Sequence, residues 1–259
     1  MYQHLLYEVI EGVARITLNR PEVYNALSPD LILEITSAVQ AAAADSSVRV
    51  VLLTATGDRA FCSGADLKIG IGEAASFGEA LRTRYNPMIM ALRTIPKPVV
   101  CRLNGLAAGA GCSLALDCDM VIASEEAYLS LLFVGIGLMP DAGATYMLPR
   151  LVGMARAFEL ASTGRRIYAP EAAQIGLIAR AVPAAQLDEA VQEVITYYRS
   201  APTQAIGAMK QAFYRSFQSD LPAMLELEAQ LQNQLGQTQD ALEGIQAFLQ
   251  KRAPDYQGI

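Results

Sequence analysis

The sequence predicts an α/β fold followed by a helical C-terminal part. Strand patterns and helical patterns alternate along the N-terminal half of the chain, as parallel strands joined by crossover helices require. From Ala155 onward, helical patterns dominate. The chain has 259 residues, 53% of them hydrophobic, so it is long enough and apolar enough to bury a large core.

The first expected elements are a hairpin and a capped helix. LLYEVIEGVARITLNRP (5–21) has two strand patterns on either side of Glu11-Gly12, which is typical of a β-hairpin. SPDLILEITSAVQAAAAD (28–45) has apolar residues at helical spacing. Ser28 is a favoured helix cap and Pro29 suits the first helical position, so a helix is predicted there.

The next elements alternate between buried strands and helices. VRVVLLTAT is a continuous apolar run of strand length, as expected for a strand that is buried on both faces. Small residues after the third strand region run into another short helix. The predicted ranges are strand 48–56, loop 57–72, helix 73–94, strand 97–105, turn and helix 106–118, and strand 119–124.

Composition and charge exclude several classes of function. The net charge is −6, which counts against nucleic acid as a partner. No apolar run reaches the roughly 18 residues of a membrane-spanning helix, and the N-terminus lacks the pattern of a signal peptide. The four cysteines show no CxxC spacing, so we expect reduced core residues in a cytoplasmic protein.

The only histidine is His4, close to the N-terminus. A Ser-His-Asp or Cys-His catalyst would have to use it, and a metal site rich in histidine cannot be built. We therefore expect no metal and no histidine-dependent nucleophile.

Two loops rich in small residues follow predicted strands. They contain FCSGADL (61–67) and NGLAAGAGCSLAL (104–116). Ligands of α/β sheets bind at the carboxyl ends of strands, and free backbone N–H groups there can form an oxyanion hole. The alternative is that the glycines serve only tight turns and close packing of helices on strands. A dinucleotide fingerprint is disfavoured, because Leu114 occupies its third glycine position.

Five motifs, in order, carry a resemblance to a known family. They are ITLNRPEVYNALS, RAFCSGADLK, KPVVCRLNGLAAGAGCSLALDCDMVIAS, VGIGLMPDAGATYMLPRLVG and AIGAMKQAF. Over nearly its whole length the chain resembles the enoyl-CoA hydratase/isomerase (crotonase) superfamily. Within it, the GLMPDAGATYMLPRLVG run and the C-terminal EGIQAFLQKRAPDYQG make it most similar to 1,2-epoxyphenylacetyl-CoA isomerases of the PaaG type.

The resemblance implies an architecture and a ligand class. The fold would be a crotonase spiral of ββα units over 1–200, with a C-terminal helical segment over 201–259 that mediates homotrimers or dimers of trimers. The substrate would be an acyl thioester of coenzyme A, with no separate cofactor, because coenzyme A is part of the substrate.

The resemblance also assigns site residues. The two oxyanion-hole N–H groups map to Ser63 and Ala110. Other candidates for contact with coenzyme A or the acyl group are Arg20, Ala65, Asp66, Leu67, Lys68, Gly109, Phe133 and Lys210. For Arg20 and Lys210 an ordinary surface position is an equally good interpretation.

The hydratases of the family use two glutamates that activate water, and both are missing here. Their positions map to Ser113 and Phe133. Ser113 cannot act as a base without a partner, and Phe133 has no ionisable group with which to transfer a proton. Asp141 is the acid that remains. It is either a helix N-cap, which lowers a carboxylate's pKa, or a buried catalytic base, whose pKa desolvation raises.

These observations predict an isomerase that uses Asp141 as its single base. It would move a double bond in an enoyl-CoA, or convert a ring-epoxide phenylacetyl-CoA to an oxepin. Three alternatives stay open: another crotonase-type enzyme, such as a hydratase or a thioesterase with water held by Ser113; a non-catalytic acyl-CoA binder; and an assembly protein.

Overall fold

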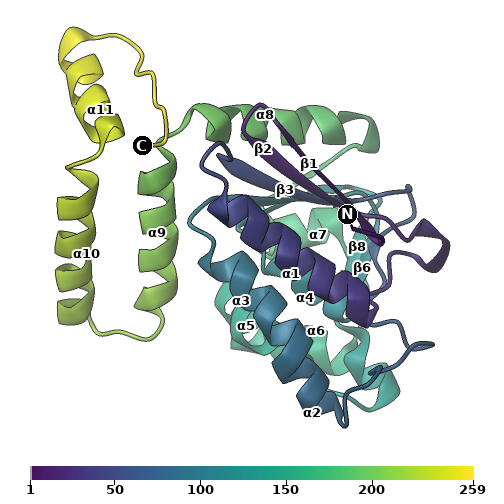
Figure 1. The fold of residues 1–259 in the computed structure, drawn as a ribbon. Helices are drawn as coiled ribbons and strands as arrows, with labels where there is room; N and C mark the ends of the chain where they lie inside the picture. Colours follow the sequence, from purple (N-terminus) through teal and green to yellow (C-terminus); the bar gives the residue numbers. More distant parts are fainter. Residues whose placement is uncertain (1) are drawn as a thin grey trace.

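The computed structural model describes residues 2–259 and is built around two β-sheets (Figure 1). The larger sheet has the strand order β1-β2-β3-β5-β7-β10. Its strands pair in parallel, apart from the antiparallel β1–β2 hairpin. The strands are β1 Leu5–Ile10, β2 Val13–Leu18, β3 Val50–Ala55, β5 Val99–Leu103, β7 Met120–Ser124 and β10 Arg180–Val182.

The predicted hairpin is confirmed. β1 and β2 pair from Leu5 opposite Leu18 to Ile10 opposite Val13. The two residues between them, Glu11 and Gly12, have φ values of 48° and 82°. Positive φ at both central residues is the geometry that matches the twist of a two-residue hairpin.

A second, four-stranded sheet is absent from the sequence prediction. Its order is β4-β6-β8-β9, with β4 inside the stretch expected to be a loop. Strands of two or three residues are too short to show a period-2 pattern, which is why the sequence does not reveal them. They are β4 Ala60–Cys62, β6 Leu106–Ala108, β8 Tyr128–Ser130 and β9 Ile167–Tyr168.

Apolar side chains on the two faces of the larger sheet enter different clusters. On β3, Val51 and Leu53 belong to the main core, whereas Val50 and Leu52 pack in a second cluster with apolar residues of α8 (Leu187–Ser200). Helix α8 therefore covers one face, and α1 (Pro29–Ala44) lies on the other side (Figure 1). The apolar run of β3 is explained, because every one of its residues is buried.

Helix α1, Pro29–Ala44, forms as predicted. The Ser28 hydroxyl accepts a hydrogen bond from Leu31 N at 3.2 Å, which satisfies one of the free N–H groups at the helix start. A short 3₁₀ helix, η1, precedes it at Pro21–Val23.

The helix predicted from Glu73 begins later and contains a π turn. It starts at Phe77, where Ser76 caps α2 (Phe77–Ala80), continues as η2 (Leu81–Tyr85) and ends as α3 (Asn86–Thr94). In η2, which is π-helical, Asn86 N donates to Leu81 O. Such turns are rare in proteins, and many of those that occur lie at functional sites.

The remaining elements of the core alternate between short helices and loops. If Asp141 were a helix N-cap, the helix after it would begin at Ala142, but α5 begins two residues later, at Ala144. The elements are α4 Ala110–Leu116, η3 Leu132–Ile136, α5 Ala144–Val152, α6 Met154–Thr163, α7 Ala169–Gln174, η4 Ala184–Gln186 and α8 Leu187–Ser200. No helix in residues 2–259 is long and apolar enough to cross a membrane.

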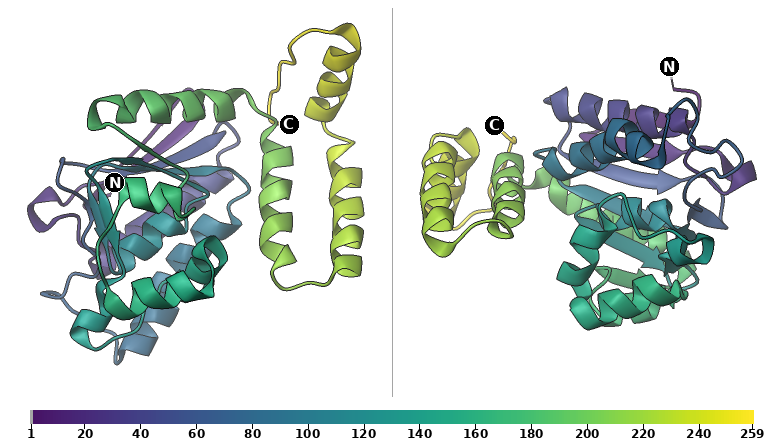
Figure 2. Two further views of the ribbon diagram at one scale, coloured as in Figure 1. Left: turned by 180° about the vertical axis from the view of Figure 1, so that it is seen from behind. Right: turned by 90° about the horizontal axis from the view of Figure 1, so that it is seen from below.

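Three helices end the chain and stand beside the sheet-containing part (Figure 2). They are α9 Thr203–Ser216, α10 Leu221–Leu235 and α11 Gln239–Gln250. Both views separate α10 and α11 from the sheets, and α9 lies closest to them. The expected helical C-terminal part is therefore present, although whether it is a separate domain stays a prediction.

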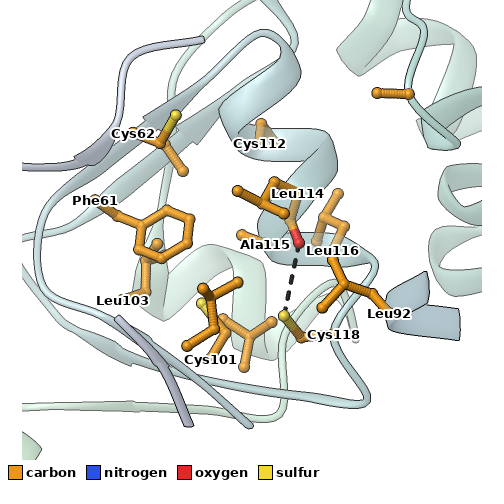
Figure 3. Close-up of a cluster of buried hydrophobic side chains, with 14 of the residues drawn as sticks. Phe61, Cys62, Leu92, Cys101, Leu103, Cys112, Leu114, Ala115, Leu116 and Cys118 are labelled. Carbon is orange, nitrogen blue, oxygen red and sulfur yellow. Dashed lines mark hydrogen bonds between the residues drawn. The ribbon is translucent and has the colours of Figure 1, made fainter. Parts of the chain in front are cut away.

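All four cysteines are free and buried, as expected for small core residues. Figure 3 shows them with Phe61 and leucines of the main core. Burial raises the pKa of Cys62 and Cys112 to about 12, so both are neutral thiols. They fill space and have no exposed reactive sulfur.

Candidate active site

A cavity of about 680 Å³ lies where the two small-residue loops meet the π turn and the segment before α5. It contains the predicted base and most of the predicted binding residues. Among its lining residues are Ser63, Gly64, Ala65, Asp66, Leu67, Arg84, Tyr85, Gly109, Ala110, Phe133 and Asp141.

Asp141 reaches this cavity from a tight turn between η3 and α5. The two residues after it, Ala142 and Gly143, have φ values of 47° and 85°. Positive φ is uncommon for alanine and occurs where the surroundings impose it, often at functional sites. Ala144 N donates to the backbone oxygen of Asp141 at 3.1 Å, which closes the turn.

The structure contradicts the helix-cap interpretation of Asp141. Helix α5 begins at Ala144, its N-cap is Gly143, and no side chain caps it. Asp141 Oδ1 is buried and makes no hydrogen bond within residues 2–259. Burial raises the pKa of Asp141 to about 6. A carboxylate with this pKa suits proton abstraction near neutral pH.

Ser113 supports the turn and is absent from the cavity wall. Its side chain is fully buried, and its Oγ donates to the backbone oxygen of Asp141 at 2.9 Å. A hydroxyl in this position holds the chain that carries the acid. This contradicts the alternative in which Ser113 holds a reacting water molecule.

A second buried acid, Asp117, packs behind the same turn. A methyl group added to Gly143, whose φ is 85°, would meet Asp117 Oδ2 at 2.6 Å and displace that carboxylate. Asp117 Oδ1 lies 3.6 Å from Arg93 Nε. Burial outweighs this pairing and raises the pKa of Asp117 to about 7. Nothing in the sequence singled out this residue.

The prediction that Ser63 supplies an oxyanion N–H is wrong. Ser63 N donates to Tyr24 O at 3.0 Å, so that hydrogen is already used. Leu27 N donates to Gly64 O and Asp66 N donates to Leu27 O. In such a parallel pairing successive N–H groups point to opposite sides, so Ala65 N points away from Leu27.

Ala65 and Ala110 each present a free N–H group at the cavity. Neither nitrogen donates a hydrogen bond within the part of the chain that the structure describes. Ala110 is the first residue of α4, where helical N–H groups have no intrahelical acceptor. Two free N–H groups at one cavity are what an oxyanion hole requires. The position next to glycine was the only sequence signal for Ala65.

Gly64 brings the two loops together. Its φ is 99°, and an added Cβ would meet Ala108 O at 2.8 Å and Ala110 N at 3.5 Å. Any side chain would push the first loop away from α4 and enlarge the distance between the two free N–H groups. The absence of a side chain at Gly64 therefore fixes the shape of the site.

Apolar side chains from η3 and the segment after it form one wall of the cavity. Phe133 is buried and lines the cavity. Around it lie Leu132, Ile136, Leu138 and Met139, whose side chains are exposed in the single chain. These residues keep water away from Asp141, which is the physical cause of its raised pKa.

Arg20 and Asp66 form an ion pair that shapes the first loop. Arg20 Nη2 donates to Asp66 Oδ2 at 3.0 Å, and Arg20 Nη1 donates to Ala26 O at 2.6 Å. Burial opposes the charge of Asp66, but the bonds from Arg20 and from Ile69 N outweigh it and lower its pKa. Asp66 is therefore an anion with a fixed partner and is not available as a base.

Of the other residues predicted to bind coenzyme A, some lie at the cavity and one lies far from it. Leu67 is exposed and lines the cavity, and Lys68 is exposed beside it. Lys210 lies elsewhere, in a separate hollow of about 560 Å³. Its Nζ is buried and donates to Asp119 Oδ2 at 2.6 Å and Leu92 O at 2.9 Å. Contact of Arg20 or Lys210 with coenzyme A stays a prediction.

Comparisons with known proteins found a matching family model and similar chains. The family model described as "Enoyl-CoA hydratase/isomerase" matches residues 8–258. A "Probable enoyl-CoA hydratase" of Rhodobacter capsulatus is 46% identical over 257 residues, covering 99% of each chain. The 1,2-epoxyphenylacetyl-CoA isomerase of Escherichia coli is 37% identical over 262 residues, covering 100% of each.

Solved structures give the same result for the fold. The crystal structure of an enoyl-CoA hydratase from Bacillus anthracis superposes with a TM-score of 0.91 at 37% identity. It covers 99% of this chain and 100% of that one. The expected crotonase fold is confirmed.

Proposed function

Because the chain belongs to the enoyl-CoA hydratase/isomerase family, we propose that it isomerises an acyl thioester of coenzyme A with Asp141 as the only base. One observation carries this proposal. Of the two acids that line the cavity, Asp66 is paired with Arg20 and Asp141 is free. A single free acid suits a proton shuttle, which neither adds nor removes water.

The thioester carbonyl accepts hydrogen bonds from Ala65 N and Ala110 N. Asp141 then breaks a C–H bond next to the carbonyl and takes the proton. The electron pair moves into the C–C–O system, and the negative charge develops on the oxygen held by the two N–H groups. The same carboxyl returns the proton to another carbon, so the carbon–carbon double bond moves and the atoms of the substrate are conserved.

Phe133 and the apolar wall support this assignment. Phe133 stands where the family's hydratases carry their second glutamate, and it moves no protons. An apolar wall that excludes water suits an unsaturated or aromatic acyl group and disfavours attack by water. The substrates proposed are therefore an enoyl-CoA, or a ring-epoxide phenylacetyl-CoA that rearranges to an oxepin.

Hydration is the second candidate function, because the relative from Rhodobacter capsulatus carries that name. Mass spectrometry of the products formed from 3-enoyl-CoA and 2-enoyl-CoA separates the two. We expect isomers whose mass equals that of the substrate. A main product heavier by one molecule of water would contradict the isomerase and support a hydratase.

We also propose that the chain assembles into a homotrimer or a dimer of trimers through its C-terminal helices. Large apolar side chains on and next to α9–α11 are exposed in the single chain, which is typical of an interaction surface. They are Met209, Phe213, Phe217, Leu221, Leu225, Leu242, Ile245, Phe248 and Leu249.

Light scattering coupled to gel filtration tests the assembly. The expected mass is three or six times that of one chain, because a trimer and a dimer of trimers both have closed point-group symmetry. Replacing Phe248 with serine should shift the mass toward one chain, because its side chain is 83% exposed. Wild-type protein that elutes with the mass of one chain would contradict the proposal.

A further inference from the structure

Tyr85 presents a phenol to the cavity from the π turn of η2. The extra residue of a π turn changes the helical register by roughly 100°, the angle between successive residues of an α-helix. Tyr85 is the last residue of that turn, and its ring packs against the main core. The turn therefore changes which face of this helical segment meets the cavity, and Tyr85 lies on that face.

The hydroxyl of Tyr85 makes no hydrogen bond within residues 2–259. Asp141 Oδ1, which belongs to the same cavity, also makes no hydrogen bond there. The other charged groups of the wall are engaged: Asp66 with Arg20, and Arg84 Nη1 with Ile71 O at 2.6 Å. Among the half-buried polar side chains of the cavity, the Tyr85 hydroxyl and the Asp141 carboxyl are thus left for a ligand. Asn86 and Thr145 also make no side-chain hydrogen bond within the described chain, but they are exposed to solvent.

The electrostatic environment keeps Tyr85 protonated. Burial raises the pKa of the phenol, and the negative charge of Asp141 raises it further. A neutral phenol is both a donor and an acceptor, so its O–H group can donate to an oxygen atom of a ligand. Tyr85 therefore offers an O–H group to the same space in which Asp141 removes a proton.

We propose that the Tyr85 hydroxyl donates a hydrogen bond to an oxygen atom of the acyl group, so that the cavity selects acyl-CoA thioesters with an oxygen substituent over hydrocarbon ones. This inference rests on the proposed function, because it takes the acyl group to lie beside Asp141. A hydrocarbon acyl group leaves the phenol without a partner in an apolar wall, and an unpaired polar group disfavours binding.

Calorimetric titration with a matched set of thioesters tests the proposal. The set is phenylacetyl-CoA and its ortho-, meta- and para-hydroxy derivatives. Wild-type protein should bind at least one hydroxy derivative roughly 10-fold more tightly than phenylacetyl-CoA. In Tyr85→Phe the two affinities should become equal, because the donor is gone while the ring stays in place.

Tyr198→Phe is the matched control. Tyr198 is a half-buried tyrosine outside the cavity, and its hydroxyl also makes no hydrogen bond in the described chain, so this variant should keep the preference of the wild type. A preference that survives in Tyr85→Phe, or wild-type protein without any preference, would overturn the proposal. None of these thioesters has a double bond in the acyl chain to move, so the result is independent of whether the protein is an isomerase.

Discussion

Replacing Asp141 with asparagine is expected to lower kcat for isomerisation by about 10²–10⁴-fold, the usual contribution of a general base. Asparagine has nearly the same shape, so the turn between Pro140 and Gly143 should persist. It has no carboxylate to take the proton. The rate of conversion of 3-enoyl-CoA to 2-enoyl-CoA measures the effect.

Asp58→Asn provides the isosteric control for this variant. Asp58 is exposed and lies outside the cavity, so its replacement should leave kcat near that of the wild type. An Asp141→Asn enzyme with full activity would remove Asp141 from the mechanism and move attention to another proton acceptor.

The pH dependence of the wild type gives an independent check on Asp141. A base works when it is deprotonated, and burial raises the pKa of this group to about 6. Activity should therefore increase as the pH rises through 6 and level off above it. An ordinary aspartate, with a pKa of about 4, would produce the plateau at a lower pH.

Replacing Ala110 with proline is expected to lower kcat by about 10²–10³-fold, as the loss of an oxyanion donor does in other enzymes. Ala110 is the first residue of α4, a position that proline favours. Its N–H has no acceptor in the described chain, so the substitution breaks no internal hydrogen bond. The thermal midpoint should stay close to that of the wild type.

Met154→Pro is the matched control for the proline. Met154 is the first residue of α6 and, like Ala110, follows a glycine N-cap with positive φ. It lies outside the cavity lining, so activity should be retained. An Ala110→Pro variant that folds and turns over at the wild-type rate would show that Ala110 N does not hold the carbonyl.

Patterns that span several residues could be predicted from the sequence. The positive-φ pair in the β1–β2 hairpin, the Ser28 cap of α1 and the burial of β3 on both faces each leave a local signature. Four of the cavity's predicted residues, Ala65, Ala110, Phe133 and Asp141, meet at one place. The motifs and their order along the chain were sufficient to predict that these residues belong to one site.

Features that depend on distant partners could not be predicted. Which of two adjacent N–H groups is free, at Ser63 or at Ala65, is decided by the Tyr24 carbonyl. Lys210 is bound to Asp119, which lies 91 positions away in the sequence.

Local geometry that leaves no sequence signature was also missed. The cap interpretation of Asp141 was open only because the start of α5 could not be fixed to within two residues. The π turn that carries Tyr85 has no recognisable pattern at all.

The most direct test of the central claim is hydrogen exchange in D₂O. Wild-type protein and Asp141→Asn are incubated with 3-enoyl-CoA, and deuterium in the recovered thioesters is followed by mass spectrometry. With the wild type we predict movement of the double bond, together with deuterium incorporation because some of the protons held by Asp141 exchange with D₂O before they are returned. With Asp141→Asn we predict neither. Exchange that continues at the wild-type rate in Asp141→Asn would contradict a mechanism in which Asp141 is the only base.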